Sequence, residues 1–138
     1  MREVLPQRLP LFVRVSATDW KEGGWDLAQT IELARQVKSL GVDLIDTSSG
    51  GAIPGVKIPL GPGYQTGFAE AIRKEPSIAT GAVGMISEPA QVETILSTEQ
   101  ADLVFLAREL LRDPYWPRRA AKALDVKIKA PVQYERAW

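Results

Sequence analysis

Residues 78–106 read IATGAVGMISEPAQVETILSTEQADLVFL, and this stretch decides the predicted fold. It starts with the apolar run Ile78–Val83 and ends with Leu103–Leu106. Both runs are short and are bounded by polar residues or glycine, which is typical of buried strands. Between them, Ser87 followed by Pro89 predicts the N-cap and first turn of a helix. The stretch therefore predicts one strand–helix–strand unit.

Two further strands are predicted upstream, at Leu11–Val15 and Val42–Ile45. A helix is predicted between them, because apolar residues recur at helical spacing and Gly41 stands at the usual stop position. A shorter helix is predicted around Phe68, and Asp113–Pro114 repeats the start signal for a last helix. The residues of the first helical repeat are Leu27, Ile31, Ala34, Val37 and Leu40.

The order of predicted elements is βαβαβαβα, which implies the α/β class with a parallel sheet and right-handed crossovers. A small doubly wound sheet and half of a (β/α)8 barrel both fit this order. A whole barrel takes about 250 residues, so four units in 138 residues are close to half of one. We expect the half barrel, with the four units in residues 1–124 and a tail in residues 125–138. Two unpaired edge strands would favour self-association, as a homodimer or a higher oligomer.

The composition narrows the possible chemistry. Basic and acidic residues number 17 each, so a formal charge of zero gives no electrostatic reason to expect nucleic acid or a membrane surface as partner. There is no histidine and no cysteine. This excludes disulfides and His-dependent triads within one chain and argues against a transition-metal site. The lack of cysteine suits a cytoplasmic location, and no apolar run approaches the roughly 20 residues of a membrane-spanning helix.

Two motifs follow predicted strands and could bind an anion. Gly81, Ala82, Val83 and Gly84 end the third strand before a helix, where glycines let a ligand approach the backbone and free amides favour a phosphate. A tight turn that needs glycine is the alternative. Arg108 follows the fourth strand, where its guanidinium is well placed for the same phosphate or for a surface salt bridge.

Three other features have two readings each. Arg14 lies within an apolar run, so it could donate to an electron-rich ring or pair with Asp46 or Asp43. The glycine-rich stretch 48–63 could be an active-site wall or a flexible loop. The tail, PVQYERAW at 131–138, could dock on a neighbouring subunit or be a disordered terminus.

Together and in this order, the motifs resemble the old yellow enzyme family, in particular its branch of small bacterial NADPH dehydrogenases and xenobiotic reductases. The resemblance spans nearly the whole chain and implies that the predicted strands correspond to strands five through eight of the family's barrel. The matching segments are LFVRVSATDW, GVDLIDTSSGG, GYQTGFAEAIR, IATGAVGMI, ADLVFLARELLRDP and APVQYERAW.

The resemblance implies a cofactor, FMN, and residues that bind it. Arg14 matches the arginine that donates to the N1/O2 edge of the flavin. Ala82, Val83 and Gly84 match the segment whose amides hold the FMN phosphate. Ala107 and Arg108 match a Gly-Arg pair that also binds phosphate, with alanine here in place of the glycine.

The resemblance also implies a role for the tail. Arg136 matches an arginine that reaches into the neighbouring subunit's active site. Trp138 matches a tryptophan that helps to wall the same pocket.

Family members reduce activated alkenes. NADPH reduces FMN, and reduced FMN delivers hydride to the β-carbon of an unsaturated carbonyl compound. The carbonyl oxygen is held by a His-His or His-Asn pair, and this chain has no histidine. We therefore assign no catalytic residue and expect no efficient turnover by the chain alone, unless an N-terminal half complements it. The alternative is a structural half barrel that oligomerises without ligand or activity.

Overall fold

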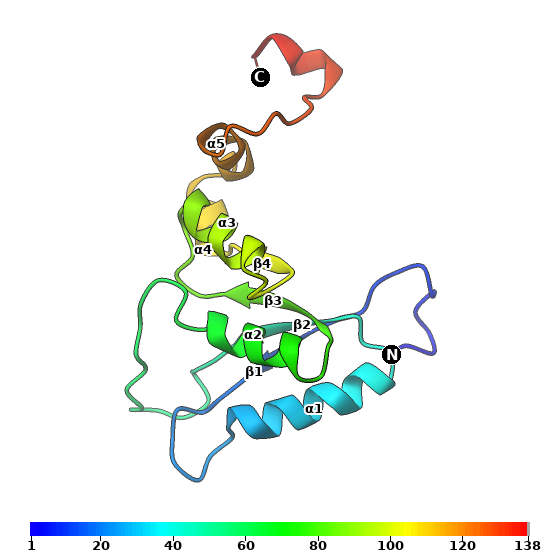
Figure 1. The fold of residues 1–138 in the computed structure, drawn as a ribbon, viewed down its shortest axis with the longest axis vertical. Coiled ribbons are helices and arrows are strands. Elements are labelled where there is room, and N and C mark those ends of the chain that lie inside the picture. Colours follow the sequence, from blue (N-terminus) through cyan, green and yellow to red (C-terminus); the bar gives the residue numbers. More distant parts are fainter. Residues whose placement is uncertain (138) are drawn as a thin grey trace.

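The computed structural model describes residues 1–137, and Figure 1 shows a parallel sheet with helices along it and the C-terminal region extending away from it. The elements follow the predicted alternation of strands and helices, with one short helix and one 3-10 helix in addition. They are β1 (Phe12–Ser16), α1 (Leu27–Ser39), β2 (Leu44–Ser48), α2 (Thr66–Lys74), β3 (Ala79–Val83), α3 (Pro89–Ser97), β4 (Leu103–Phe105), α4 (Arg108–Arg112), α5 (Trp116–Ala123) and η1 (Val132–Ala137).

The four strands form one sheet in the order β1-β2-β3-β4, and every neighbouring pair is parallel. The predicted α/β class with a parallel sheet is therefore confirmed. The register places Arg14, Asp46, Gly81 and Leu103 at one level across the sheet. Within residues 1–137, β1 and β4 each have a single neighbouring strand. Both edges of the sheet are thus open to pairing.

One face of the sheet is covered by helices. Its side chains include Ile45, Thr47 and Ala82, which are 1%, 0% and 0% exposed. Two apolar clusters lie between this face and the helices. The first contains Ile31, Ala34, Ile45, Ile72 and Ile78, and the second contains Ala69, Ala82, Ile86, Ile95 and Ala101.

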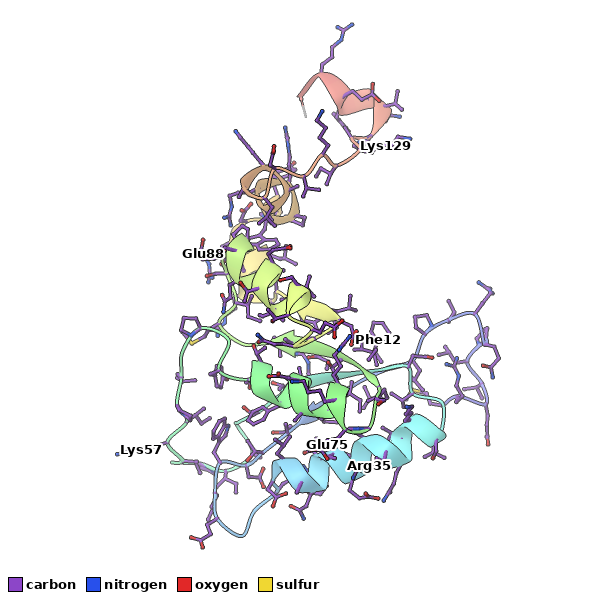
Figure 2. All side chains as sticks on the ribbon, in the orientation of Figure 1. Phe12, Arg35, Lys57, Glu75, Glu88 and Lys129 are labelled. Atoms are coloured by element: carbon purple, nitrogen blue, oxygen red, sulfur yellow. The ribbon has the colours of Figure 1, made fainter. Side chains whose placement is uncertain are left out.

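Local signals explain where α1 begins and how it is tied to α2. Asp26 accepts a hydrogen bond from the Gln29 amide at 2.9 Å, while the Gln29 side chain accepts one from the Asp26 amide at 3.0 Å. This capping box satisfies two amide donors that the helix itself leaves free. Figure 2 shows Arg35 on α1 beside Glu75 after α2, and Arg35 Nη2 lies 3.1 Å from Glu75 Oε2.

The opposite face of the sheet is uncovered at the two edge strands, whereas Leu44 of the central strand β2, on the same face, is 4% exposed. Phe12 is 45% exposed and Leu103 is 42% exposed, and both face the same side as Arg14. The prediction that Leu11–Val15 and Leu103–Leu106 are buried strands is therefore wrong, because neither run contains a buried residue. The physical reason is that these are the two edge strands, whose one free side and one free face both meet solvent.

One predicted N-cap and one predicted helix start are also wrong. α3 begins at Pro89 as expected, but its N-cap is Glu88, and the carbonyl of Ser87 instead accepts a hydrogen bond from Trp116 Nε1 at 2.7 Å. The last helix begins at Trp116 and not at Asp113–Pro114. Asp113 ends α4, and its carboxylate accepts a hydrogen bond from the Tyr115 amide at 3.0 Å. This carboxylate therefore closes a turn between two helices.

Over residues 125–137, the tail carries more regular structure than its sequence predicted. It starts with the Val126 amide, which donates to the Ala121 carbonyl at 2.8 Å at the end of α5. It then contains η1, and Arg118 of α5 donates to the Ala137 carbonyl at the end of η1. Within residues 1–137, no helix is both long and apolar enough to cross a membrane.

Candidate functional site

A cavity of about 350 Å³ opens at the carboxyl ends of β3 and β4. It lies between the segment after β3 and the segment that leads from β4 into α4. Four of the residues predicted from the sequence line it: Val83, Gly84, Ala107 and Arg108. The two predicted anion-binding motifs, separated in the sequence, thus meet at one site. The other lining residues are Pro62, Met85, Ile86, Ser87, Phe105, Leu106, Glu109 and Arg112.

The cavity carries one positive charge that is not neutralised locally. Glu109 is bound to Arg112, with 2.5 Å between Oε2 and Nη2, and also lies 3.4 Å from Arg119. Arg108 makes no ion pair or side-chain hydrogen bond with any residue from 1 to 137. A guanidinium with free donors in a lined cavity is suited to a phosphate or carboxylate.

Arg119 adds no net charge near the cavity, because a second carboxylate, that of Asp113, also pairs with it. Its Nε donates to Asp113 Oδ2 at 2.8 Å. This hydrogen bond is the main cause that raises the pKa of Arg119 above its usual value, and burial opposes it only in part. The guanidinium therefore lies beside both Asp113 and Glu109.

The backbone on the β3 side of the cavity is tightly constrained. Gly84 has φ +120°, and a Cβ there would lie 2.6 Å from Gln65 Nε2 and 3.0 Å from Tyr64 Cε1. Met85 follows with φ +51°, a left-handed conformation that non-glycine residues rarely adopt. The Gly63 amide donates to the Gly84 carbonyl at 3.0 Å. Glycine at 84 is thus required both by conformation and by the close approach of the α2 side.

Sequence reasoning missed Gln65, which is 2% exposed and touches this segment. Its Nε2 donates to the Val83 carbonyl at 2.8 Å, and its Oε1 accepts from Ser49 Oγ at 2.6 Å. Ser49 Oγ in turn accepts from Trp20 Nε1 at 3.0 Å. A glutamine inside the matched segment GYQTGFAEAIR carries no chemical signal of its own, so only the fold reveals this contact.

Gly81 and Ala82 are two of the three predicted cofactor-binding residues that do not line the cavity. Gly81 lies within β3 on the open face, and a Cβ there would come within 2.1 Å of Phe105 Cε2. The glycine therefore makes room for the Phe105 ring. Ala82 is fully buried on the helix-covered face, in the second apolar cluster. The structure thus gives both residues a packing role.

Arg14 lies on the open face and is paired. Its Nε lies 2.5 Å from Asp46 Oδ2, while Asp43 pairs with Arg2 instead. The Arg14 side chain is 54% exposed and that of Asp46 only 8%. Burial raises the pKa of Asp46, and the hydrogen bond and charge of Arg14 offset this in part. Of the two alternatives for Arg14, the structure therefore shows the ion pair, and its partner is Asp46.

Arg14 does not line the cavity, because β1 and β4 are separated by β2 and β3. Three strand spacings amount to about 14 Å. A ligand that touched both Arg14 and Arg108 would therefore have to be elongated.

The tail residues lie apart from this cavity. Arg136 lines a second cavity, of about 770 Å³, between the tail and α5. Its charged lining residues are all basic: Arg118, Arg119, Lys122, Lys127 and Arg136. Trp138 lies outside the described residues.

Comparison with known proteins assigns the chain to a protein family. The model of the NADH:flavin oxidoreductase / NADH oxidase family matches residues 2–127. The chain belongs to this family. The resemblance to old yellow enzymes that the motifs indicated is thereby confirmed.

Curated relatives of this oxidoreductase family include NADPH dehydrogenases. The chain is 57% identical over 129 residues to those of Bacillus licheniformis and Halalkalibacterium halodurans, and 55% identical to that of Bacillus subtilis. Each alignment covers 94% of this chain and 38% of the relative. The chain therefore spans less than half the length of the relatives it matches.

Among solved structures, histamine dehydrogenase from Rhizobium sp. 4-9 is similar, with a TM-score of 0.68. The superposition covers 83% of this chain and 17% of that one, at 21% identity. A likeness at this identity concerns the fold alone, and it supports a TIM-barrel-like arrangement of strands and helices.

The donor set of the first cavity fits the phosphate end of a flavin nucleotide. Arg108 offers free guanidinium donors, Gly84 has no side chain, and the charges of Arg108, Glu109 and Arg112 leave one positive charge. A phosphate monoester requires such an excess of positive charge and donors. The family's usual cofactor is thus compatible with the residues present at this site.

Proposed function

We propose that this chain forms the FMN-phosphate-binding part of an NADPH-dependent oxidoreductase that reduces activated C=C bonds of unsaturated carbonyl compounds. One observation carries this proposal: the cavity that unites Gly84 with the unpaired Arg108 at the carboxyl ends of β3 and β4. Phosphate sites after the last two strands are common in (β/α)8 barrels. The identity to NADPH dehydrogenases supports the same assignment.

The proposal gives each residue a limited role. Arg108 neutralises the phosphate, Gly84 allows it to approach the backbone, and Ala107 offers its amide. Arg14 would donate to the pyrimidine edge of the ring, if it leaves or shares its contact with Asp46. FMN, when bound, supplies the hydride chemistry, with NADPH as reductant.

In this proposal the chain binds flavin but does not reduce an enone by itself. It has no histidine to hold the carbonyl oxygen of the substrate. A complementing chain with an N-terminal half would have to supply that group. Arg136, with Trp138, would extend towards a neighbouring subunit's pocket, and the lack of cysteine suits the cytoplasm.

The cofactor part of the proposal is tested by titrating FMN with the purified chain and following the quenching of flavin fluorescence. Saturable quenching is expected, and Arg108→Ala should weaken it at least about tenfold because the principal charge-assisted contact is lost. Arg35→Ala is the matched control, since it removes an equal charge from α1, away from the cavity. No saturation with the wild-type chain, or equal losses in both variants, would reject the phosphate site.

The half-barrel architecture and its self-association form part of the same proposal. Four parallel strands with two open edges and an exposed apolar face could close against a second copy. Sedimentation velocity should show a concentration-dependent dimer that Phe12→Asp weakens. Leu60→Asp is the control, because Leu60 is also exposed, at 67%, but lies in the loop after β2. A strict monomer at all concentrations would contradict this assembly.

A structural half barrel without ligand is the second candidate. It is favoured by the packing of the Phe105 ring over Gly81 and by the pairing of Arg14 with Asp46, which give two predicted ligand residues structural roles. The same FMN titration separates it from the first, since this candidate predicts no quenching.

A further inference from the structure

Three hydrogen bonds link the loops that follow β1 and β2 to the end of β3. Trp20 lies after β1, Ser49 directly after β2, and Val83 is the last residue of β3. Gln65, at the N-cap position of α2, joins them, through Ser49 on one side and the Val83 carbonyl on the other. We call this chain of contacts, from Trp20 through Ser49 and Gln65 to Val83, the loop clasp.

The chemistry of the groups fixes the direction of every hydrogen bond in the loop clasp. The Trp20 indole N–H can only donate, and the Val83 carbonyl can only accept. Gln65 must therefore turn its Nε2 towards Val83 and its Oε1 towards Ser49, whose hydroxyl donates to Oε1 and accepts from Trp20. No member has an alternative orientation that keeps all three contacts.

The side chain of Gln65 does not cap the helix that it precedes. Gln65 is the N-cap residue of α2, yet its side chain makes no capping hydrogen bond. Instead it spans from the loop after β2 to the end of β3 while being 2% exposed. The buried side-chain amide of Gln65 does not cap α2 and instead donates to a carbonyl beside the cavity. This hydrogen bond holds that carbonyl in place.

The segment that Gln65 holds needs such support. Gly84 approaches Gln65 so closely that a Cβ would lie 2.6 Å from Nε2, and Met85 has a left-handed φ of 51°. Non-glycine residues in this conformation persist where the surroundings fix them. At the other end of the loop clasp, Trp20 also has a left-handed φ, 57°, and its ring packs on Phe68 with centroids 5.5 Å apart.

We propose that Gln65 is a positioning residue for the phosphate end of the bound cofactor, fixing Val83–Gly84 through the loop clasp so that the cavity wall is preformed. This inference rests on the proposed function, because it names the residue that shapes the same site. It touches neither the phosphate nor the flavin ring.

The test combines two measurements on the full chain. Hydrogen–deuterium exchange of the segment 83–86 reports the loop itself without ligand. The dissociation constants of FMN and of riboflavin, which lacks the phosphate, report the site. Gln65→Glu removes the donor to Val83 at unchanged size, and Ser49→Ala is a milder second variant. Gln100→Glu is the control, since the Gln100 side chain donates to Thr98 before β4 and lies outside the loop clasp.

Gln65→Glu should speed exchange in 83–86 and weaken FMN binding about tenfold, while riboflavin binding stays unchanged. Ser49→Ala should act in the same direction but less, and it decides the matter where Gln65→Glu fails to fold. Unchanged exchange, or equal losses for FMN and riboflavin, would overturn the positioning role. If the wild-type chain binds neither flavin while both variants loosen 83–86, the proposed function fails and the loop clasp stands.

Discussion

The two faces of this sheet differ in how completely they are covered, although the same four strands supply both. On the helix-covered face Ile45 is 1% exposed, whereas on the opposite face Phe12 is 45% and Leu103 is 42% exposed. Successive side chains of a strand point to opposite faces, and the difference between the faces lies at the two edge strands, because Leu44 of β2 lies on the open face and is only 4% exposed. The ion pair between the exposed Arg14 and the buried Asp46 lies on the open face, as does the Phe105 ring that packs over Gly81.

This difference indicates that the covered face mainly stabilises the fold, whereas the open face carries the residues that could contact a ligand or another chain. The covered face holds the two apolar clusters that pack against the helices. The open face carries charge, glycine and exposed apolar side chains, which are features of surfaces that meet a ligand or another chain. The proposed phosphate site lies at the carboxyl edge where the open face ends.

The largest expected loss of stability follows from a substitution in the core under the covered face. Ile72 is 0% exposed in the first cluster, so Ile72→Ala removes buried methyl groups and leaves a cavity. We expect a loss of about 2–5 kcal/mol in the free energy of unfolding, measured with urea. A loss below about 1 kcal/mol would mean that this cluster is not the core.

The next effect lies on the open face. Gly81→Ala places a Cβ within 2.1 Å of Phe105 Cε2 and should destabilise the chain by about 1–3 kcal/mol. The double variant Gly81→Ala with Phe105→Ala should recover part of this loss, because the obstructing ring is gone. Additive losses in the double variant would contradict the packing role of Gly81.

A smaller effect concerns the pH dependence of stability. Burial raises the pKa of Asp46 above its usual value near 3.8, so the folded chain retains a proton that the unfolded chain releases. The unfolding free energy should fall as pH rises from about 4 through the raised pKa, and become flat above it.

Asp46→Asn should remove this decline, and Asp43→Asn should not, since Asp43 is half exposed and paired with Arg2. Urea unfolding at several pH values is the measurement. Identical pH profiles of the wild-type chain and Asp46→Asn would show that burial does not shift this carboxyl.

The smallest effect is expected for an exposed apolar residue on the open face. Leu103→Ala removes a side chain that is 42% exposed and should cost at most about 1 kcal/mol in dilute solution. If the loss grows with protein concentration, a second copy covers this face and the proposed self-association gains support. A loss as large as that of Ile72→Ala at all concentrations would remove the distinction between the faces.

The sequence by itself determined the order of elements, because each signal is local. Periodic apolar residues with Gly41 as stop located α1, and four short apolar runs located the strands. Ordered motifs also identified the family and named Gly84 and Arg108, which meet in one cavity. Parallel strands bring their carboxyl ends to the same edge, so this meeting follows from the predicted topology.

Only the tertiary structure decided which faces and edges of the sheet are buried, since the exposure of a strand depends on what packs against it and not on its own amino-acid sequence. Leu11–Val15 looks as apolar as the central strands, yet it lies at an edge with one face open. Gly81 and Gly84 stand in one motif, but alternation and twist direct the first to Phe105 and the second to Gln65. Gln65 carries no pattern in the sequence, and its contacts arise only in the fold, where its side chain bonds Ser49 after β2 and the Val83 carbonyl at the end of β3.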